Sequence, residues 1–268
     1  TFCNSETRKL PRTKVINEEV LPRIHEASMK LLEETGIVFE HDEALEIFKQ
    51  HGAKVDGKTV FISRKMAEAA MKQAPSTYLH RGRNDDQSVT IGDGMAPHPN
   101  VGCVFIEEMG AERRRGLLAD YANIQIISQA SQYCKLTGAS PVAPDDVPPS
   151  ERALYMLYET IKHTDKPLIG SCVDAKKAKE SLEMVEMVFG ADYMRDNYCV
   201  GVSTNPLSPF KYATETLDSI IEYAKKRQPV YILACAMAGA TSPMSIFGSI
   251  VQQNTEIVAG ITLVQLIN

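Results

Sequence analysis

The second half of the chain, residues 133–268, repeats one pattern four times. Each repeat is a short run of small and β-branched residues followed by a segment with apolar residues three and four positions apart. The first kind of segment predicts a buried strand and the second an amphipathic helix. Repeated strand–helix units imply a parallel sheet with right-handed crossovers. We therefore expect an α/β fold of the TIM (β/α)8 barrel type, of which this chain supplies about four β/α units.

The boundaries of the four units follow from turn and capping signals. The predicted strands are 134–140, 167–172, 198–204 and 230–235, and the last helix is predicted to start with Ser242 as its N-cap and Pro243 in its first turn. A doubly wound open sheet is the main alternative, but no Gly-x-Gly-x-x-Gly follows any of these strands. The pattern stops after the fourth unit, so we expect the second half of the barrel to be absent. The unpaired edges then predict a fragment or an obligate oligomer.

Residues 1–116 have a different organisation and predict a preface to residues 117–268, which we take as the first half of the barrel. Three amphipathic helices are expected at 17–36, 42–52 and 64–73, with Asn17, Asp42 and Ser63 as N-caps. A hairpin is expected around Asp56–Gly57. Three short strands, 78–81, 88–91 and 103–106, predict a small antiparallel sheet that caps or floors the barrel.

Composition excludes several function classes. The net charge of −5 gives no electrostatic reason to expect nucleic acid or an anionic membrane as a partner. None of the six cysteines forms a Cys-x-x-Cys motif, which argues against a local zinc site. Reduced, buried thiols fit a cytoplasmic protein best.

The longest apolar stretch, residues 245–267, is interrupted at its centre by polar residues that include Gln252 and Glu256. A bilayer would penalise this interruption, so the stretch predicts a buried helix rather than a membrane span. Glu256 stands alone in that helix. We expect a buried hydrogen bond between it and a neighbouring element.

The carboxyl ends of the predicted strands are the expected place for a site, because active sites of parallel β/α folds lie there. These ends carry no Lys, His, Asp or Glu, which argues against a Schiff-base, metal-dependent or acid/base mechanism assembled from this half. No metal ligand set and no catalytic residue is identified. The candidates for hydrogen bonding to a substrate or a cofactor are small polar residues together with one histidine in a proline-flanked loop: Ser140, Ser171, Cys172, Thr204, Asn205, Cys235 and His98.

Several stretches together resemble the trimethylamine methyltransferase family: residues 23–37 (RIHEASMKLLEETGI), the hairpin 52–57 (GAKVDG), the run 202–209 (VSTNPLSP) and the segment 256–260 (EIVAG). The similarity extends over nearly the whole chain beyond the first dozen residues. No single motif is diagnostic, but their order and spacing are specific.

The resemblance implies a corrinoid-dependent methyltransferase on a (β/α)8 barrel. Such enzymes move a methyl group from trimethylamine, or from a quaternary amine such as glycine betaine, to the cobalt of a corrinoid (cobalamin) carried by a separate protein. The chain itself would bind no cofactor covalently, and its partners would be the corrinoid protein and the small methylated amine. A quaternary ammonium calls for an aromatic cage or a carboxylate, and the nearest aromatics are Phe210 and Tyr212, just past the third strand.

Two other functions remain open from the sequence. The first is a barrel enzyme of another chemistry, such as a lyase, whose catalytic residues all lie in the second half. The second is a truncated homologue that binds a partner or a small molecule without turnover. Methyl transfer to added corrinoid is expected of the methyltransferase, and a different activity is expected of the other barrel enzyme. Binding without turnover is expected of the truncated homologue.

Overall fold

A parallel three-stranded sheet organises the second half of the chain in a computed structural model that describes residues 17–268. Its strands, β8 (Leu168–Gly170), β9 (Val200–Thr204) and β11 (Val230–Ile232), lie in the order β8–β9–β11. Leu168 pairs with Val200, and Val202 pairs with Val230. These are the second, third and fourth predicted strands, parallel and in sequence order as expected. The described residues do not close this sheet into a barrel.

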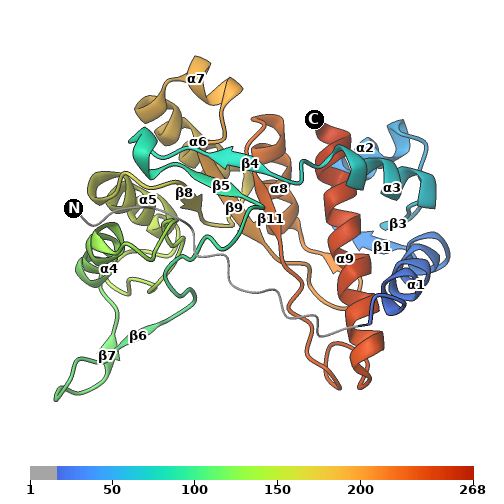
Figure 1. The fold of residues 1–268 in the computed structure, drawn as a ribbon, viewed down its shortest axis with the longest axis horizontal. Helices are drawn as coiled ribbons and strands as arrows, with labels where there is room; N and C mark the ends of the chain where they lie inside the picture. The colour runs from blue at the N-terminus through green and yellow to red at the C-terminus, as the bar shows by residue number, and fades with distance from the viewer. Residues whose placement is uncertain (1–16) are drawn as a thin grey trace.

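Helices cover one face of this sheet (Figure 1). The connections are α5 (Arg152–His163), α6 (Ala175–Phe189), α7 (Ala191–Asp196) and α8 (Thr214–Lys225). Alternate strand residues, including Val200 and Val202, pack with apolar side chains of α6 and with Tyr223 of α8. Because strand side chains alternate between faces, the residues between them point to the opposite side.

The first predicted strand, residues 134–140, runs beside β8 but does not form a regular strand. Thr137 N donates to Pro167 O at 3.1 Å. The next ladder bond is made by a side chain instead, because Ile169 N donates to the Thr137 hydroxyl at 2.9 Å. The side-chain hydroxyl of Thr137 thus takes the place of a backbone carbonyl as the hydrogen-bond acceptor for β8. The helix before this segment is α4 (Leu118–Ala130).

The N-terminal region forms a second sheet, in which one strand comes from the other half of the chain. The order is β10–β1–β3–β2, and β10 is parallel to β1. The strands are β1 (Ile37–Phe39), β2 (Lys54–Asp56), β3 (Thr59–Phe61) and β10 (Lys211–Tyr212), and the helices are α1 (Val20–Glu34), α2 (Asp42–Gln50) and α3 (Arg64–Gln73). The predicted hairpin is therefore confirmed as β2–β3. Of the predicted caps, Ser63 is confirmed, whereas His41 rather than Asp42 caps α2 and the N-cap of α1 is Glu19 rather than Asn17.

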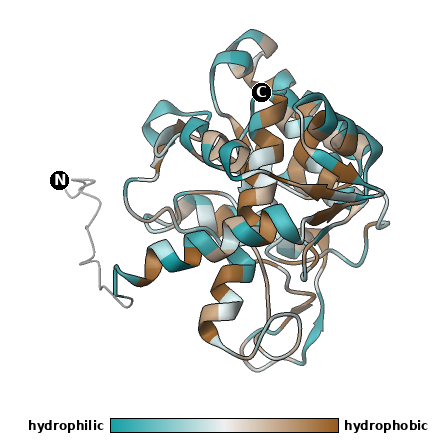
Figure 2. Cartoon of the chain, turned by 90° about the vertical axis from the view of Figure 1, so that its right-hand side faces the viewer, coloured by the Kyte–Doolittle hydropathy of each residue, from teal (hydrophilic) through white to brown (hydrophobic). Residues whose placement is uncertain are grey.

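The long helix α9 (Ile246–Ile267) lies between this N-terminal region and the parallel sheet (Figure 1). One core joins side chains of α1, α2 and β1 with Leu217 and Ile220 of α8 and with Val258 and Leu263 of α9. Figure 2 shows α9 as largely hydrophobic. The helix begins later than predicted, because Ser245 is its N-cap and the Ser242 hydroxyl bonds to Ser249 instead.

The predicted three-stranded antiparallel sheet is wrong in its pairing, because it divides into two hairpins. The first, β4 (Tyr78–His80) with β5 (Val89–Ile91), encloses the short 3-10 helix η1 (Asp85–Gln87). It lies at the amino ends of the parallel strands, where Arg81 N donates to Tyr198 O at 2.7 Å. The second, β6 (Phe105–Ile106) with β7 (Arg114–Arg115), projects from the body as an arm (Figure 1).

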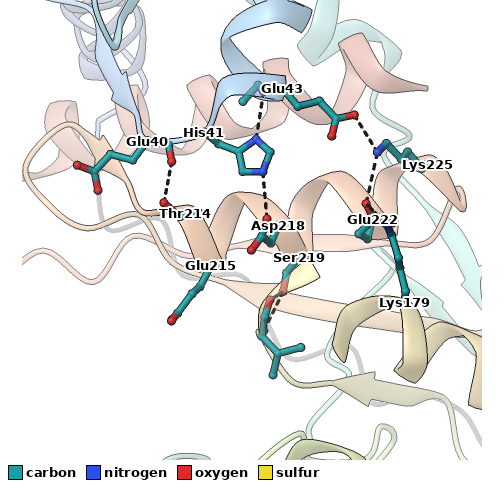
Figure 3. Close-up of polar contacts among 12 residues, drawn as sticks. Glu40, His41, Glu43, Lys179, Thr214, Glu215, Asp218, Ser219, Glu222 and Lys225 are labelled. Carbon is teal, nitrogen blue, oxygen red and sulfur yellow. Dashed lines mark hydrogen bonds and ion pairs between the residues drawn. The ribbon is translucent and has the colours of Figure 1, made fainter. Parts of the chain in front are cut away.

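A row of polar contacts joins α2 to α8 (Figure 3). The imidazole of His41 accepts a hydrogen bond from Ala44 N through Nδ1, and its Nε2 lies 3.0 Å from the carboxylate of Asp218. The ring therefore caps one helix while it donates to another. The side chains of His41 and Asp218 are only 19% and 14% exposed, so water competes weakly for this contact.

We expect His41→Ala to lower the free energy of unfolding by about 1 to 2 kcal/mol, because it removes a helix cap and leaves Asp218 without its partner. Urea unfolding measures this change. The matched control is His51→Ala at the other end of α2, where the exposed ring bonds only to Ile47 O. It should cost less than about 0.5 kcal/mol. Equal effects of the two substitutions would contradict the bridging role of His41.

Candidate functional site

The candidate site lies on the face of the parallel sheet that, among residues 17–268, is turned away from α6 and α8. We call this face the open face, and it is formed by Ile169, Ser171, Gly201, Ser203, Tyr231 and Leu233, the residues that alternate with those packed against α6 and α8. Ser171, Ser203 and Tyr231 are half-buried, whereas Leu233 is exposed. This face therefore offers hydroxyl groups and one aromatic ring in a line across three strands.

Three of the residues predicted at the strand ends lie on the same side as the open face: Ser171, Asn205 and Cys235. Asn205 is exposed, and its Nδ2 donates to Leu233 O at 2.6 Å, which ties the end of β9 to the end of β11. Cys235 is exposed two residues beyond that carbonyl. Ser171 follows β8 directly. Because side chains alternate between faces along each strand and the strands are parallel neighbours, these three positions lie at the same edge of the sheet.

Two other predicted residues point the opposite way. Thr204 is fully buried, and its hydroxyl donates to Tyr231 O at 3.3 Å. Cys172 turns toward α8, where its Sγ lies 4.0 Å from Glu215 O. Each of these side chains thus contacts backbone of a neighbouring element and does not lie on the open face.

Of the remaining predicted residues, Ser140 ends the 134–140 segment and His98 belongs to the loop 97–102 that runs beside this segment. Gly102 N donates to Ser140 O at 2.8 Å, and the amides of Lys135 and Leu136 donate to Pro97 O. The loop that carries His98 therefore covers one edge of this segment. The imidazole itself is exposed, with Nδ1 2.6 Å from Pro99 O. Within residues 17–268, no hydrogen bond joins any two of the seven predicted side chains.

Sequence reasoning missed a cluster of Tyr78, His80 and Tyr231 at the amino-end side of the open face. The Tyr78 hydroxyl donates to the Tyr231 hydroxyl at 2.6 Å, and the Tyr231 hydroxyl lies 3.1 Å from Nδ1 of His80. The Tyr231 ring occupies the space above Gly201, where any Cβ would overlap it. The signal in the sequence was the glycine within a predicted strand, which often marks a close approach of another group.

His80 is fully buried within this cluster. Nδ1 of the ring lies against the Tyr231 hydroxyl, and Nε2 is buried as well. Burial, which penalises the charged imidazolium, lowers the pKa of His80 to about 4. A neutral, fully buried imidazole beside a tyrosine hydroxyl fits a rigid floor below the open face and does not fit a general base with access to solvent.

Exposed apolar side chains surround the carboxyl ends of the strands. They belong to loop A, residues 205–210 after β9, and loop B, residues 233–245 after β11, and to the start of α9. Their exposed fractions lie between 49% and 83%: Leu207, Leu233, Met237, Met244 and Ile246. The two aromatics nearest in sequence, Phe210 and Tyr212, pack instead into the core shared with α9.

Two absences hold for the part of the chain that the structure describes. No group of three or more His, Cys, Asp or Glu side chains is arranged to hold a metal ion. No helix combines the length and the apolar composition needed to cross a bilayer.

The buried His80 predicts a dependence of stability on pH. Because the folded pKa of about 4 lies below the ordinary value of 6.5, the unfolded chain binds the extra proton first as pH falls. The contribution of His80 to the free energy of unfolding is therefore complete above pH 6.5. It is lost at about 1.4 kcal/mol per pH unit as the pH falls toward 4. Urea unfolding from pH 7 to 4.5 should show a shallower decline for His80→Gln than for the wild type. Parallel declines would refute this, and His51→Gln is the control with an exposed ring.

The chain was compared with known proteins. Residues 3–268 match the family described as trimethylamine methyltransferase (MTTB). A glycine betaine methyltransferase of Desulfitobacterium hafniense is 38% identical over 97% of this chain and 54% of its own length. A trimethylamine methyltransferase MttB of the same species is 32% identical over 93% of this chain and 51% of its own. A proline betaine:corrinoid methyltransferase of Eubacterium limosum is 30% identical over 95% and 54%.

The chain thus spans about half the length of the curated relatives it matches. The family match, by contrast, extends over almost all of this chain, and it includes both the N-terminal region and the parallel sheet with its open face. The chain belongs to the trimethylamine methyltransferase family.

Proposed function

We propose that this chain is part of a methyltransferase that moves a methyl group from a quaternary amine such as glycine betaine to the cobalt of a corrinoid carried by a separate protein. The observation that carries the proposal is the 38% identity to a glycine betaine methyltransferase over 97% of the chain. The proposal includes the (β/α)8 barrel, of which β8, β9 and β11 with their helices would be consecutive units.

The chemistry of the strand ends favours a quaternary amine over trimethylamine. Among the described residues, the ends of β8, β9 and β11 carry hydroxyl, amide and thiol groups and no Lys, His, Asp or Glu. A quaternary amine leaves as a neutral tertiary amine once it loses a methyl group, so it needs no proton from the protein. Trimethylamine releases neutral dimethylamine on losing a methyl group only when its nitrogen carries a proton. A site without acids at these strand ends therefore suits the quaternary substrate.

In this proposal the open face binds and orients the amine. Hydroxyl groups of Ser171 and Ser203 and the amide of Asn205 would hold the carboxylate of a betaine, and the half-buried Tyr231 ring would face its cationic end. The corrinoid, when brought by its protein, supplies the acceptor for the methyl group. The exposed apolar side chains of loops A and B suit the docking of such a partner at the strand ends.

The proposal extends to assembly and location. Val202 N donates to Pro229 O and Leu233 N to Thr204 O, so the amides of Val230 and Ile232 point away from β9 toward an edge that no described strand occupies. Either a further strand of the proposed barrel or a second copy of the chain in a homo-oligomer would pair with this edge. The five cysteines of the described residues are all free, which supports a cytoplasmic location. We also propose that residues 1–116 are the preface of the barrel that begins at 117.

The direct test mixes the protein with glycine betaine, trimethylamine or proline betaine in the presence of a chemically reduced corrinoid. We expect proton NMR to show loss of one methyl group from glycine betaine, with methylation of the corrinoid detected by its absorbance. Turnover of trimethylamine alone would contradict the preference for a quaternary amine. Binding of an amine without any transfer would favour the binding homologue.

Asn205→Ala should weaken glycine betaine binding about tenfold, because one hydrogen bond to a charged carboxylate is worth on the order of 1.5 kcal/mol. Isothermal titration calorimetry measures the change. The matched control is Asn84→Ala, since Asn84 is exposed at the opposite end of the strands and bonds only within its own turn. Equal affinities of the two variants would exclude Asn205 from the site.

A further inference from the structure

A stripe of three polar residues runs along one face of α9. Ser249, Gln252 and Glu256 recur three and four positions apart, and they are 7%, 4% and 0% exposed. Burial of such groups is costly unless each has hydrogen-bond partners. Their partners come from the two loops that follow the parallel strands, loop A and loop B.

Glu256 holds loop A. Its Oε2 accepts from the Ser208 hydroxyl at 2.7 Å, and its Oε1 accepts from Phe210 N at 3.0 Å. The backbone carbonyl of the same residue accepts from the Tyr212 hydroxyl at 2.8 Å. The carboxylate therefore fixes the end of the loop that starts with Asn205, and its hydrogen bonds take the place of a cationic partner.

Gln252 and Ser249 hold loop B. One amide group, Nε2 of Gln252, donates both to Thr241 O at 2.9 Å and to Oε1 of Glu256 at 3.0 Å. The Ser249 hydroxyl donates to Pro243 O at 2.7 Å. Glu256 thus reaches loop B through Gln252, and the two loops share one hydrogen-bond network inside the protein.

We infer that Glu256 is a positioning residue that holds loops A and B as a single unit at the strand ends. The two loops also meet directly, where Asn205 Nδ2 donates to Leu233 O. Because the loops carry Asn205 and the exposed apolar residues Leu207 and Met237, their joint position sets the surface beside the open face. That this surface receives an amine rests on the proposed function, whereas the coupling of the loops does not.

Amide hydrogen exchange, followed by mass spectrometry on the whole protein, tests the coupling without any substrate. Glu256→Ala should speed exchange about tenfold or more in both loops, because both lose the carboxylate that orders them. Glu256→Gln should stay close to the wild type, since the amide oxygen can accept from Phe210 and the Ser208 hydroxyl can reverse to accept. Thr262→Val is the matched control: Thr262 is equally buried in α9, but its hydroxyl bonds only to Val258 O.

Two milder substitutions keep the test decisive if Glu256→Ala does not fold. Ser208→Ala should loosen loop A alone, and Gln252→Ala should loosen loop B. The inference is overturned if neither loop responds to these substitutions, or if Glu256→Ala raises exchange equally throughout α1 and α9. Glycine betaine titration separates the two claims. If the wild type binds glycine betaine and Glu256→Ala binds it about tenfold more weakly, both claims are supported. If the wild type does not bind glycine betaine, the proposed function is wrong, and the exchange data still decide whether the two loops are coupled.

Discussion

A carboxylate buried in an apolar helix must find hydrogen-bond donors, and this requirement determines how the strand ends of this protein are arranged. Glu256 meets it with Ser208, Phe210 and Gln252, all within 3.0 Å. Ser208 and Phe210 lie on loop A, and Gln252 is a neighbour on α9 that also donates to Thr241 O of loop B. The buried Glu256 carboxylate would be destabilising without these donors, and it therefore favours the one arrangement of loops A and B that supplies them.

The same helix explains why the N-terminal region and the parallel sheet form one body. α9 packs on α1, α2 and α3 on one side and on α8 and β11 on the other. The strand β10 extends the N-terminal sheet from the other half of the chain, and the bridge from His41 to Asp218 adds a polar contact beside the apolar core. Ser249, Gln252 and Glu256 of α9 bond to the loops, while Val258 and Leu263 of the same helix pack in the core, so one helix connects the site to the core.

Local patterns in the sequence were sufficient for much of the fold. Strands and helices of the second half, the hairpin β2–β3 and the cap at Ser63 follow from periodicity and turn chemistry, which act over a few residues. The failures have tertiary causes. The Thr137 hydroxyl takes the place of a backbone ladder bond, and β6 pairs with β7 rather than joining β4 and β5 in one sheet. The Tyr78–Tyr231–His80 cluster joins residues more than 150 positions apart, and no local pattern encodes such a contact. Alternate residues of a strand point to opposite faces of the sheet, and this alternation decides which candidates lie on the open face. Asn205 lies on that face, whereas Cys172 points toward α8.

The most direct measurement for the account is a titration of isotope-labelled protein with glycine betaine, followed by amide NMR shifts. Saturable shifts are expected at Ser171, Ser203, Asn205 and neighbouring residues of loop A, with smaller shifts at loop B through the shared network. The amides of η1, at the opposite end of the strands, should not move. Saturable shifts confined to that opposite end, or no shifts at any betaine concentration that saturates a site of millimolar affinity, would contradict the account.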